Sequence, residues 1–131
     1  MEHLYIQNTA LTPEISFSAD DGQFSIRGKS IPEDAEEFYQ PVLEWMEEYS
    51  KISSTNIHLT IELEFFNISS SKRILFLMYK LNELVDKGLN VKITWSYKEN
   101  DDDMFEVGQD YAFMVNIPFE FHTFTEQVVV A

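Results

Sequence analysis

The sequence predicts an α/β fold: a single two-layer domain in which a mixed β-sheet carries helices mainly on one face. Apolar and polar residues alternate over residues 57–65 and again over residues 91–97, which is the period of a half-buried strand. Between these strands, apolar residues recur at steps of three and four over residues 74–85, which is the period of a helix. A strand, helix, strand order normally makes the two strands parallel, with the helix covering the apolar face.

Length and composition are those of one compact domain. The chain has 131 residues, of which 44% are hydrophobic and 15% aromatic. Such a chain can form one core and is too apolar to be disordered throughout. Because no repeat, low-complexity tract or Pro/Gly/Ser-rich linker marks a boundary, we expect one domain over residues 1–131, with about 122–131 as a flexible tail.

The N-terminal part predicts a hairpin followed by a helix. Two β-prone runs, 14–17 and 23–27, flank Asp20-Asp21-Gly22, which has the Asp-Gly chemistry of a tight turn. In Ser30-Ile31-Pro32-Glu33, Ser stands three residues before Glu, which predicts a helix start. Since Pro41 lacks an amide proton, we expect a kink or a second helix start at that point.

The C-terminal part predicts a helix and a last strand. Gly88 stands where the helix over 74–85 would need a C-cap. The run Asn100-Asp101-Asp102-Asp103 predicts the cap of a short helix that ends near Phe113. Residues 115–121 then predict a strand, at the edge of the sheet because Pro118 cannot donate a ladder hydrogen bond.

Charge and cysteine content exclude several classes of partner and site. Nine basic and 23 acidic residues give a formal charge of −14, which repels nucleic acid and anionic membrane surfaces alike. The absence of Cys excludes disulfides, thiolate zinc sites and a cysteine nucleophile. The N-terminus has no signal-peptide pattern, and no apolar run reaches the roughly 18 residues of a membrane helix. We therefore expect a cytoplasmic protein.

One alternative function uses the polar face of the strand over 57–65. His58, Glu62 and Glu64 share that face, so a small enzyme or ligand-binding domain with an acid/base cluster is conceivable. Alternating charges are equally typical of a solvated sheet face, and no nucleophile, phosphate loop or cofactor motif accompanies them. The better interpretation is a protein without catalytic residues and without a cofactor.

Metal ligands are not indicated by the sequence either. His3, His58 and His122 lack the spacing of a ligand set. The run Asp101-Asp102-Asp103 lacks the alternating oxygen ligands, the central Gly and the terminal Glu of a calcium loop. We expect no metal site.

Hydroxyl side chains cluster where the strand over 57–65 ends and the next helix begins, in Phe65-Phe66-Asn67-Ile68-Ser69-Ser70-Ser71-Lys72. Free amides at a helix N-terminus favour an anion, so the fold would tolerate a phosphorylated side chain there, and its charge would alter docking. The plain structural interpretation is a serine N-cap with serine neighbours.

Three segments of the sequence resemble the SiaC family of bacterial regulatory phosphoproteins: Ser30 to Glu33, Phe65 to Lys72, and Trp95-Ser96-Tyr97 followed by acidic residues. The similarity covers about residues 4–121. It implies a non-enzymatic partner-switching protein with a STAS-like fold, similar to anti-sigma-factor antagonists. It also implies three protein partners: a kinase of the ATP-binding type, a metal-dependent phosphatase, and a diguanylate cyclase or similar effector that binds the unphosphorylated form.

The sequence departs from the family at the position of the phosphoacceptor. The family usually has Thr directly after the Asn, whereas this chain has Ile68, which has no hydroxyl. Either Ser69 has become the acceptor, or the protein no longer switches by phosphorylation; we favour Ser69. The switch region around Ser69 would consist of Asn67, Ile68, Ser70, Ser71 and Lys72.

Overall fold

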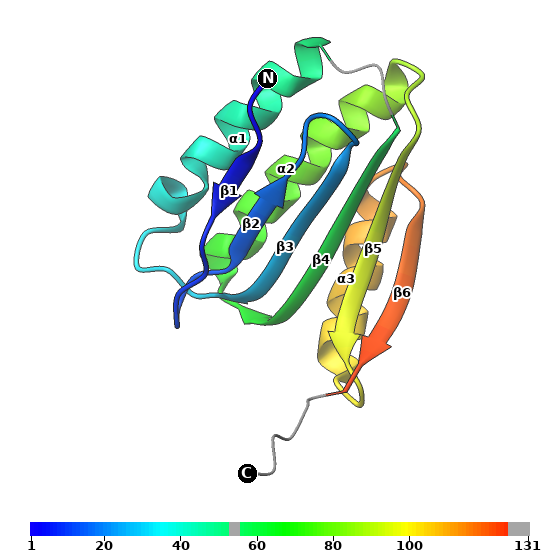
Figure 1. Ribbon diagram of the computed structural model, residues 1–131. Helices are drawn as coiled ribbons and strands as arrows, with labels where there is room; N and C mark the ends of the chain where they lie inside the picture. Colours follow the sequence, from blue (N-terminus) through cyan, green and yellow to red (C-terminus); the bar gives the residue numbers. More distant parts are fainter. Residues whose placement is uncertain (53–55, 126–131) are drawn as a thin grey trace.

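The computed structural model describes residues 1–52 and 56–125, which form a six-stranded sheet and three helices (Figure 1). The strands are β1 (Leu4–Ile6), β2 (Glu14–Phe17), β3 (Gln23–Ser30), β4 (Ile57–Phe66), β5 (Val91–Lys98) and β6 (Phe119–Phe124). The helices are α1 (Ala35–Ile52), α2 (Ile68–Asp86) and α3 (Asp102–Met114). None of the helices in this part of the chain is both long and apolar enough to cross a membrane.

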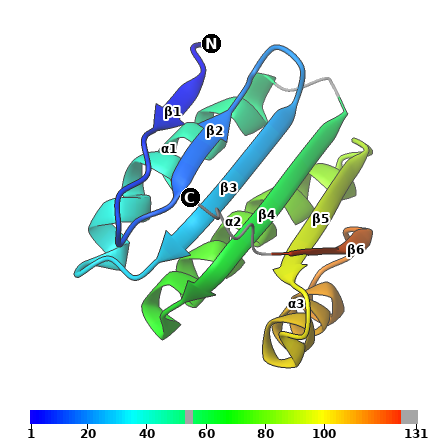
Figure 2. The same ribbon diagram turned by 60° about the horizontal axis from the view of Figure 1, so that its bottom comes forward.

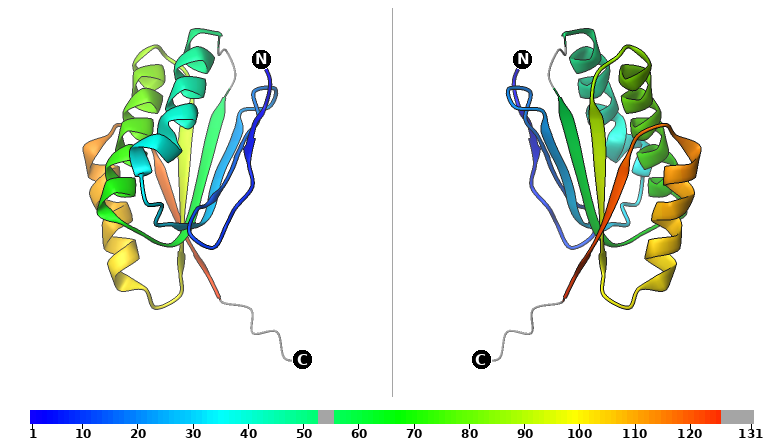
Figure 3. Two further views of the ribbon diagram at one scale, coloured as in Figure 1. Left: turned by 90° about the vertical axis from the view of Figure 1, so that its left-hand side faces the viewer. Right: turned by 90° about the vertical axis from the view of Figure 1, so that its right-hand side faces the viewer.

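The strands lie in the sheet in the order in which they occur along the chain. β1, β2 and β3 pair antiparallel, whereas β3, β4, β5 and β6 are parallel to one another. Each helix connects two neighbouring parallel strands. Such crossovers are right-handed, and each one here moves to the next strand in the same direction across the sheet. All three helices therefore lie on one face. Figure 3 shows the helices on one side of the sheet, and Figure 2 shows β1 and β6 at its two edges. The predicted two-layer mixed fold is confirmed.

The core lies between the sheet and the helices. On β4, residues Ile57, Leu59, Ile61 and Leu63 are buried. From α2, Leu77 and Leu81 are buried at the spacing that the helical period predicts. Around them lie buried residues from the other elements, including Phe24, Ile26, Val42, Met46, Ile93 and Trp95.

The two predicted glycine turns are confirmed. Gly22 has a positive φ of 69° and its N–H donates to the Ser18 carbonyl at 3.1 Å, so it closes the β2–β3 hairpin. Gly88 follows the last turn of α2 with a φ of 94°, a backbone conformation that residues with a Cβ rarely adopt. The short strand β1, which pairs with β2, was not predicted, because three residues are too few to show a period.

The predicted start of the first helix is wrong. Ser30 ends β3, and α1 begins at Ala35, where the Asp34 carboxylate accepts a hydrogen bond from the Glu37 N–H at 3.0 Å. Ser30 cannot cap the helix because its buried hydroxyl bonds to other side chains. The second helix start expected at Pro41 is also wrong, since α1 is continuous through it. Pro41 is exposed within the second turn, where solvent can reach the carbonyl that loses its donor.

The last strand lies at the sheet edge, as predicted, but begins at Phe119 rather than at residue 115. Val115 and Ile117 are buried in the connection, which explains their strand-like apolar pattern. β6 also continues through Phe124, so the first residues of the expected tail belong to the sheet. Residues 126–131 of that expected tail lie outside the described residues.

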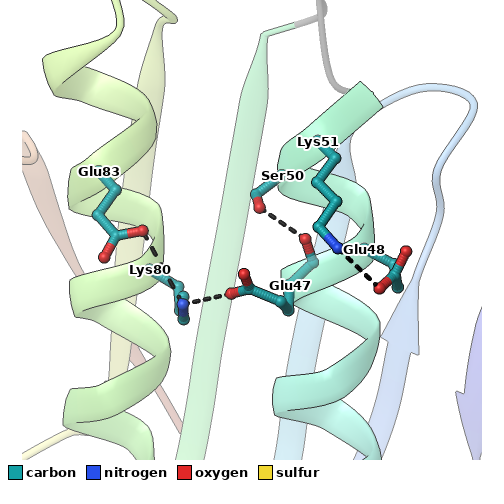
Figure 4. A network of polar contacts seen from close by, with 6 residues as sticks. All are labelled: Glu47, Glu48, Ser50, Lys51, Lys80 and Glu83. Atoms are coloured by element: carbon teal, nitrogen blue, oxygen red, sulfur yellow. Dashed lines mark hydrogen bonds and ion pairs between the residues drawn. The ribbon is translucent and has the colours of Figure 1, made fainter.

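Helices α1 and α2 lie side by side on the sheet, and an ion pair joins them. Lys80 of α2 donates a hydrogen bond to the Glu47 carboxylate of α1 (Figure 4). This hydrogen bond lowers the pKa of Glu47 and raises the pKa of Lys80. Partly exposed ion pairs add little stability, so apolar packing on the sheet is what holds the two helices together.

Gly108 lies where α3 packs closely against Trp95. A Cβ at residue 108 would lie 2.5 Å from Cδ1 and 2.6 Å from Nε1 of the Trp95 indole. The ring is buried, and its N–H donates to the Met104 carbonyl at 3.0 Å, so it cannot move without losing that bond.

We expect Gly108→Ala to lower the free energy of unfolding by about 1–2 kcal/mol. Overpacking costs about 1–3 kcal/mol, and an approach of 2.5 Å to a fixed ring belongs to the upper half of that range. The roughly 1 kcal/mol advantage of Ala in a helix offsets part of this cost. Urea unfolding measures the effect, with the exposed neighbour Gln109→Ala as the matched control. Equal stability of the two variants would show that α3 does not pack on Trp95 as described.

Candidate functional site at the start of α2

A bulge at the end of β4 determines which aromatic side chain faces solvent. The register of β4 against β3 shifts by one residue after Leu63, so Glu64 has no opposite residue on β3. The bulge reverses the alternation: Phe66 packs against the core, and Phe65 is 45% exposed. The expectation that Phe65 shares the buried face with Leu63 is therefore wrong.

Asn67 follows the last residue of β4 and is the N-cap of α2. Its side-chain oxygen accepts a hydrogen bond from the Ser70 N–H at 2.8 Å, which satisfies one of the free donors of the first turn. Its own N–H donates to the Ser30 carbonyl at 3.0 Å, and its Nδ2 donates to the Pro32 carbonyl at 3.4 Å. The cap is thus Asn67 rather than a serine, and it fixes the start of α2 to the end of β3.

Two of the three serines that follow point inward. Ser70 is buried, and its hydroxyl accepts a hydrogen bond from Ser30 Oγ at 2.8 Å, which lies 2.7 Å from the Tyr39 hydroxyl. Ser71 Oγ lies 2.7 Å from the Tyr111 hydroxyl of α3. Burial raises the pKa of Tyr39 to about 12 and also raises the pKa of Tyr111, so both keep their protons at neutral pH. These hydrogen bonds attach the first turn of α2 to both neighbouring helices.

Ser69 and Ile68 point outward instead. The Ser69 side chain is exposed, and its hydroxyl has no hydrogen bond within residues 1–52 and 56–125. Ile68 is 90% exposed. The first turn of α2 therefore presents one free hydroxyl and one apolar side chain to solvent.

Ser69 lies in a shallow hollow between the starts of α1 and α2. The other residues that line it are Glu33, Asp34, Ala35, Glu36, Lys72 and Arg73. Arg73 is paired with Glu36 at 3.6 Å. The hollow thus holds three carboxylates and two cations, and a phosphate on Ser69 would compete with Glu36 for Arg73.

Ile68 borders a different cavity, between the starts of α2 and α3. This groove has a volume of about 430 Å³. It is lined by Glu64, Phe65, Phe66, Asn67, Ile68, Ser71, Asp101, Asp103, Met104 and Val107. Of the predicted switch region, Asn67, Ile68 and Ser71 line this groove, whereas Lys72 lies beside Ser69 in the other hollow.

The contribution of α3 to this groove was not predicted. Met104, Val107 and Tyr111 recur at steps of three and four, a signal that could have indicated that this helix covers a neighbouring element. The same signal says nothing about which element, because that depends on the crossover from β5 to β6.

The polar sheet face does not bring the alternative acid/base residues together. His58 Nε2 lies 2.6 Å from Thr94 Oγ1, whereas Glu62 accepts hydrogen bonds from Arg27 and Ser96, both at 3.2 Å. His58 and Glu62 are four residues apart on β4, which separates them by roughly 13 Å along the strand.

The surroundings of these three side chains also differ from one another. Burial, followed by the nearby Lys92, lowers the pKa of His58. A polar hollow of about 450 Å³ includes His58 but neither Glu62 nor Glu64. Glu64 instead pairs with Lys29 at 3.8 Å.

The match to a known family covers strands β2 to β6, the three helices and the groove. The family model of the SiaC regulatory phosphoproteins matches residues 6–124. The chain belongs to the SiaC family. The elements that carry the three SiaC-like segments, β3, β4, α2 and β5, all lie inside that match.

Relatives with known structures share the fold of this SiaC-family chain over almost its whole length. The crystal structure of apo-SiaC from Pseudomonas aeruginosa has a TM-score of 0.86 and 26% identity, covering 93% of this chain and 99% of that one. SiaC in complex with the diguanylate cyclase SiaD, which it activates, has a TM-score of 0.87 and 26% identity, covering 92% and 99%. An uncharacterized protein of Pseudomonas aeruginosa strain UCBPP-PA14 is 27% identical over 119 residues, covering 91% and 94%.

Proposed function

We propose that this SiaC-family protein binds a diguanylate cyclase and regulates its activity through the first turn of α2, without being an enzyme itself. The observation that supports this best is the exposed Ile68 beside an open groove at the helix start. An exposed apolar side chain that borders a groove is suited to protein docking. The SiaC of Pseudomonas aeruginosa, which has the same fold, is the activator of the cyclase SiaD.

Within the same proposal, Ser69 is the phosphoacceptor. A kinase must reach the hydroxyl oxygen, and Ser70 is buried while Ser71 is bonded to Tyr111. Transfer of the γ-phosphoryl group of ATP to Ser69 Oγ releases ADP and the hydroxyl proton. A metal-dependent phosphatase would return the hydroxyl by hydrolysis, releasing inorganic phosphate. We place both reactions and the cyclase complex in the cytoplasm.

The charge of the phosphate would act on docking and leave the fold intact. Phosphorylation adds about −1.5 to −2 charges, and Lys72 and Arg73 line the same hollow as Ser69. A helix N-terminus also stabilises negative charge. A partner that covers the first turn would have to desolvate the phosphate, which weakens its binding.

A binding measurement tests the proposed function. We expect the purified chain to form a stable complex with a diguanylate cyclase from the same organism, with a dissociation constant that calorimetry can determine. Tyr79→Ser, which changes a 44% exposed residue of α2 outside both hollows, should bind like the wild type. No heat of binding and no co-elution with that cyclase would contradict the proposal.

A further inference from the structure

The groove beside Ile68 combines an apolar lining with an acidic rim. Phe65 and Ile68 are its exposed apolar residues, and Met104 and Val107 of α3 line it from the other side. Single exposed apolar residues are ordinary, but residues from two elements that line one groove point to a binding site for an apolar group.

The charges at the rim are negative. Glu64, Asp101 and Asp103 all line the groove. Lys29 offsets Glu64, with which it pairs at 3.8 Å. Asp101 accepts a hydrogen bond from the Met104 N–H at 3.0 Å as the cap of α3.

Asp103 adds a further negative charge that is not offset nearby. It is exposed in the first turn of α3 and has no ion pair in the part of the chain that the structure describes. The α3 side of the rim therefore carries the excess negative charge. It lies on a chain whose formal charge is already −14, so cationic partners are attracted from a distance as well.

We infer that this groove binds an amphipathic helix of the partner protein, with an apolar side chain against Ile68 and Phe65 and with Lys or Arg beside Asp101 and Asp103. A groove between two helix starts fits a helix whose apolar face enters it, and charge complementarity fixes its orientation. The inference rests on the proposed docking function and adds the chemistry that the partner surface must have.

A peptide titration tests this surface directly. The probe is a fluorescein-labelled amphipathic helix of Leu and Lys, and the matched control probe replaces Lys with Glu. We expect the Leu/Lys peptide to bind the full chain and the Leu/Glu peptide to bind far more weakly. Ile68→Ser should weaken binding about tenfold, as removal of a central apolar contact does. Asp103→Asn should weaken it several-fold and reduce its salt dependence.

Two control variants separate a site from general charge attraction. Tyr79→Ser removes an exposed ring elsewhere on α2, and Glu83→Gln removes an exposed carboxylate elsewhere on the same helix. Both should bind the Leu/Lys peptide like the wild type. The inference is overturned if Glu83→Gln weakens binding as much as Asp103→Asn, if Ile68→Ser has no effect, or if the two peptides bind equally.

Self-association is the competing use of the same groove. Sedimentation equilibrium of the wild type and of Ile68→Ser, without peptide, detects it. A dimer that Ile68→Ser dissociates would assign the groove to a second copy of the chain and overturn the inference.

The peptide and cyclase experiments distinguish failure of the groove inference from failure of the proposed function. If the Leu/Lys peptide does not bind but the cyclase does, the inferred groove partner is wrong and the proposed function stands. If groove-dependent peptide binding is found but no cyclase complex forms, the proposed cyclase regulation is wrong and the inferred chemistry of the groove stands.

Discussion

Replacing Leu81 with alanine is expected to lower the free energy of unfolding by about 2–5 kcal/mol, the range measured when a buried Leu becomes Ala. Leu81 is fully buried in the layer between α2 and the sheet. Its neighbours on that face belong to rigid strands and helices, which can close only part of the cavity. Such a loss is a large fraction of the stability of a domain of this size.

Denaturant unfolding of Leu81→Ala and Tyr79→Ala compares the loss of stability at a buried and at an exposed residue of the same helix. Tyr79 is exposed on the opposite side of α2, so its removal should change stability by no more than about 0.5 kcal/mol. If the two substitutions cost the same, α2 does not pack on the sheet by the face described.

The second large effect is expected on phosphate uptake. When the wild type is incubated with ATP and a protein kinase of the ATP-binding type from the same organism, intact mass should rise by one phosphate per chain. Ser69→Ala should take up none, because the other two serines of the turn are engaged in the fold. Ser71→Ala is the matched control and should be modified like the wild type. Circular dichroism of the phosphorylated chain should match that of the unmodified chain.

The alternative outcome identifies a protein that has lost the switch. If the kinase leaves the wild type unmodified, and Ile68→Thr takes up phosphate at residue 68, then Ser69 is only a helix residue. In that case Ile68 would hold the protein permanently in the binding-competent form.

The layers of the fold were predictable from periodicity, because burial on one face of a strand or helix leaves a regular trace in the sequence. The trace is lost where geometry changes within an element. One extra residue at Glu64 reverses the alternation of β4, so Phe65 is exposed and Phe66 is partly buried. Periodicity also cannot distinguish the capping hydroxyl expected at Ser30 from the buried hydroxyl found there.

The candidate site could be predicted only in part for the same reason. The segment from Asn67 to Ser71 is continuous in sequence, so its hydroxyl cluster was visible. The outward direction of Ser69, by contrast, depends on tertiary hydrogen bonds that hold its neighbours inward: Ser30 donates to Ser70, and the hydroxyls of Ser71 and Tyr111 bond to each other. The groove depends on a crossover that brings α3 beside the start of α2. Neither leaves a local sequence signal.

The rate of cyclic di-GMP formation tests the central claim most directly. A diguanylate cyclase from the same organism is titrated with the unmodified chain, with Ile68→Ser and with Tyr79→Ser. The account predicts a saturable change in rate with the wild type and Tyr79→Ser, and a half-saturating concentration about tenfold higher with Ile68→Ser. A rate that the wild type leaves unchanged, or that all three proteins change equally, would contradict regulation of the cyclase through the first turn of α2.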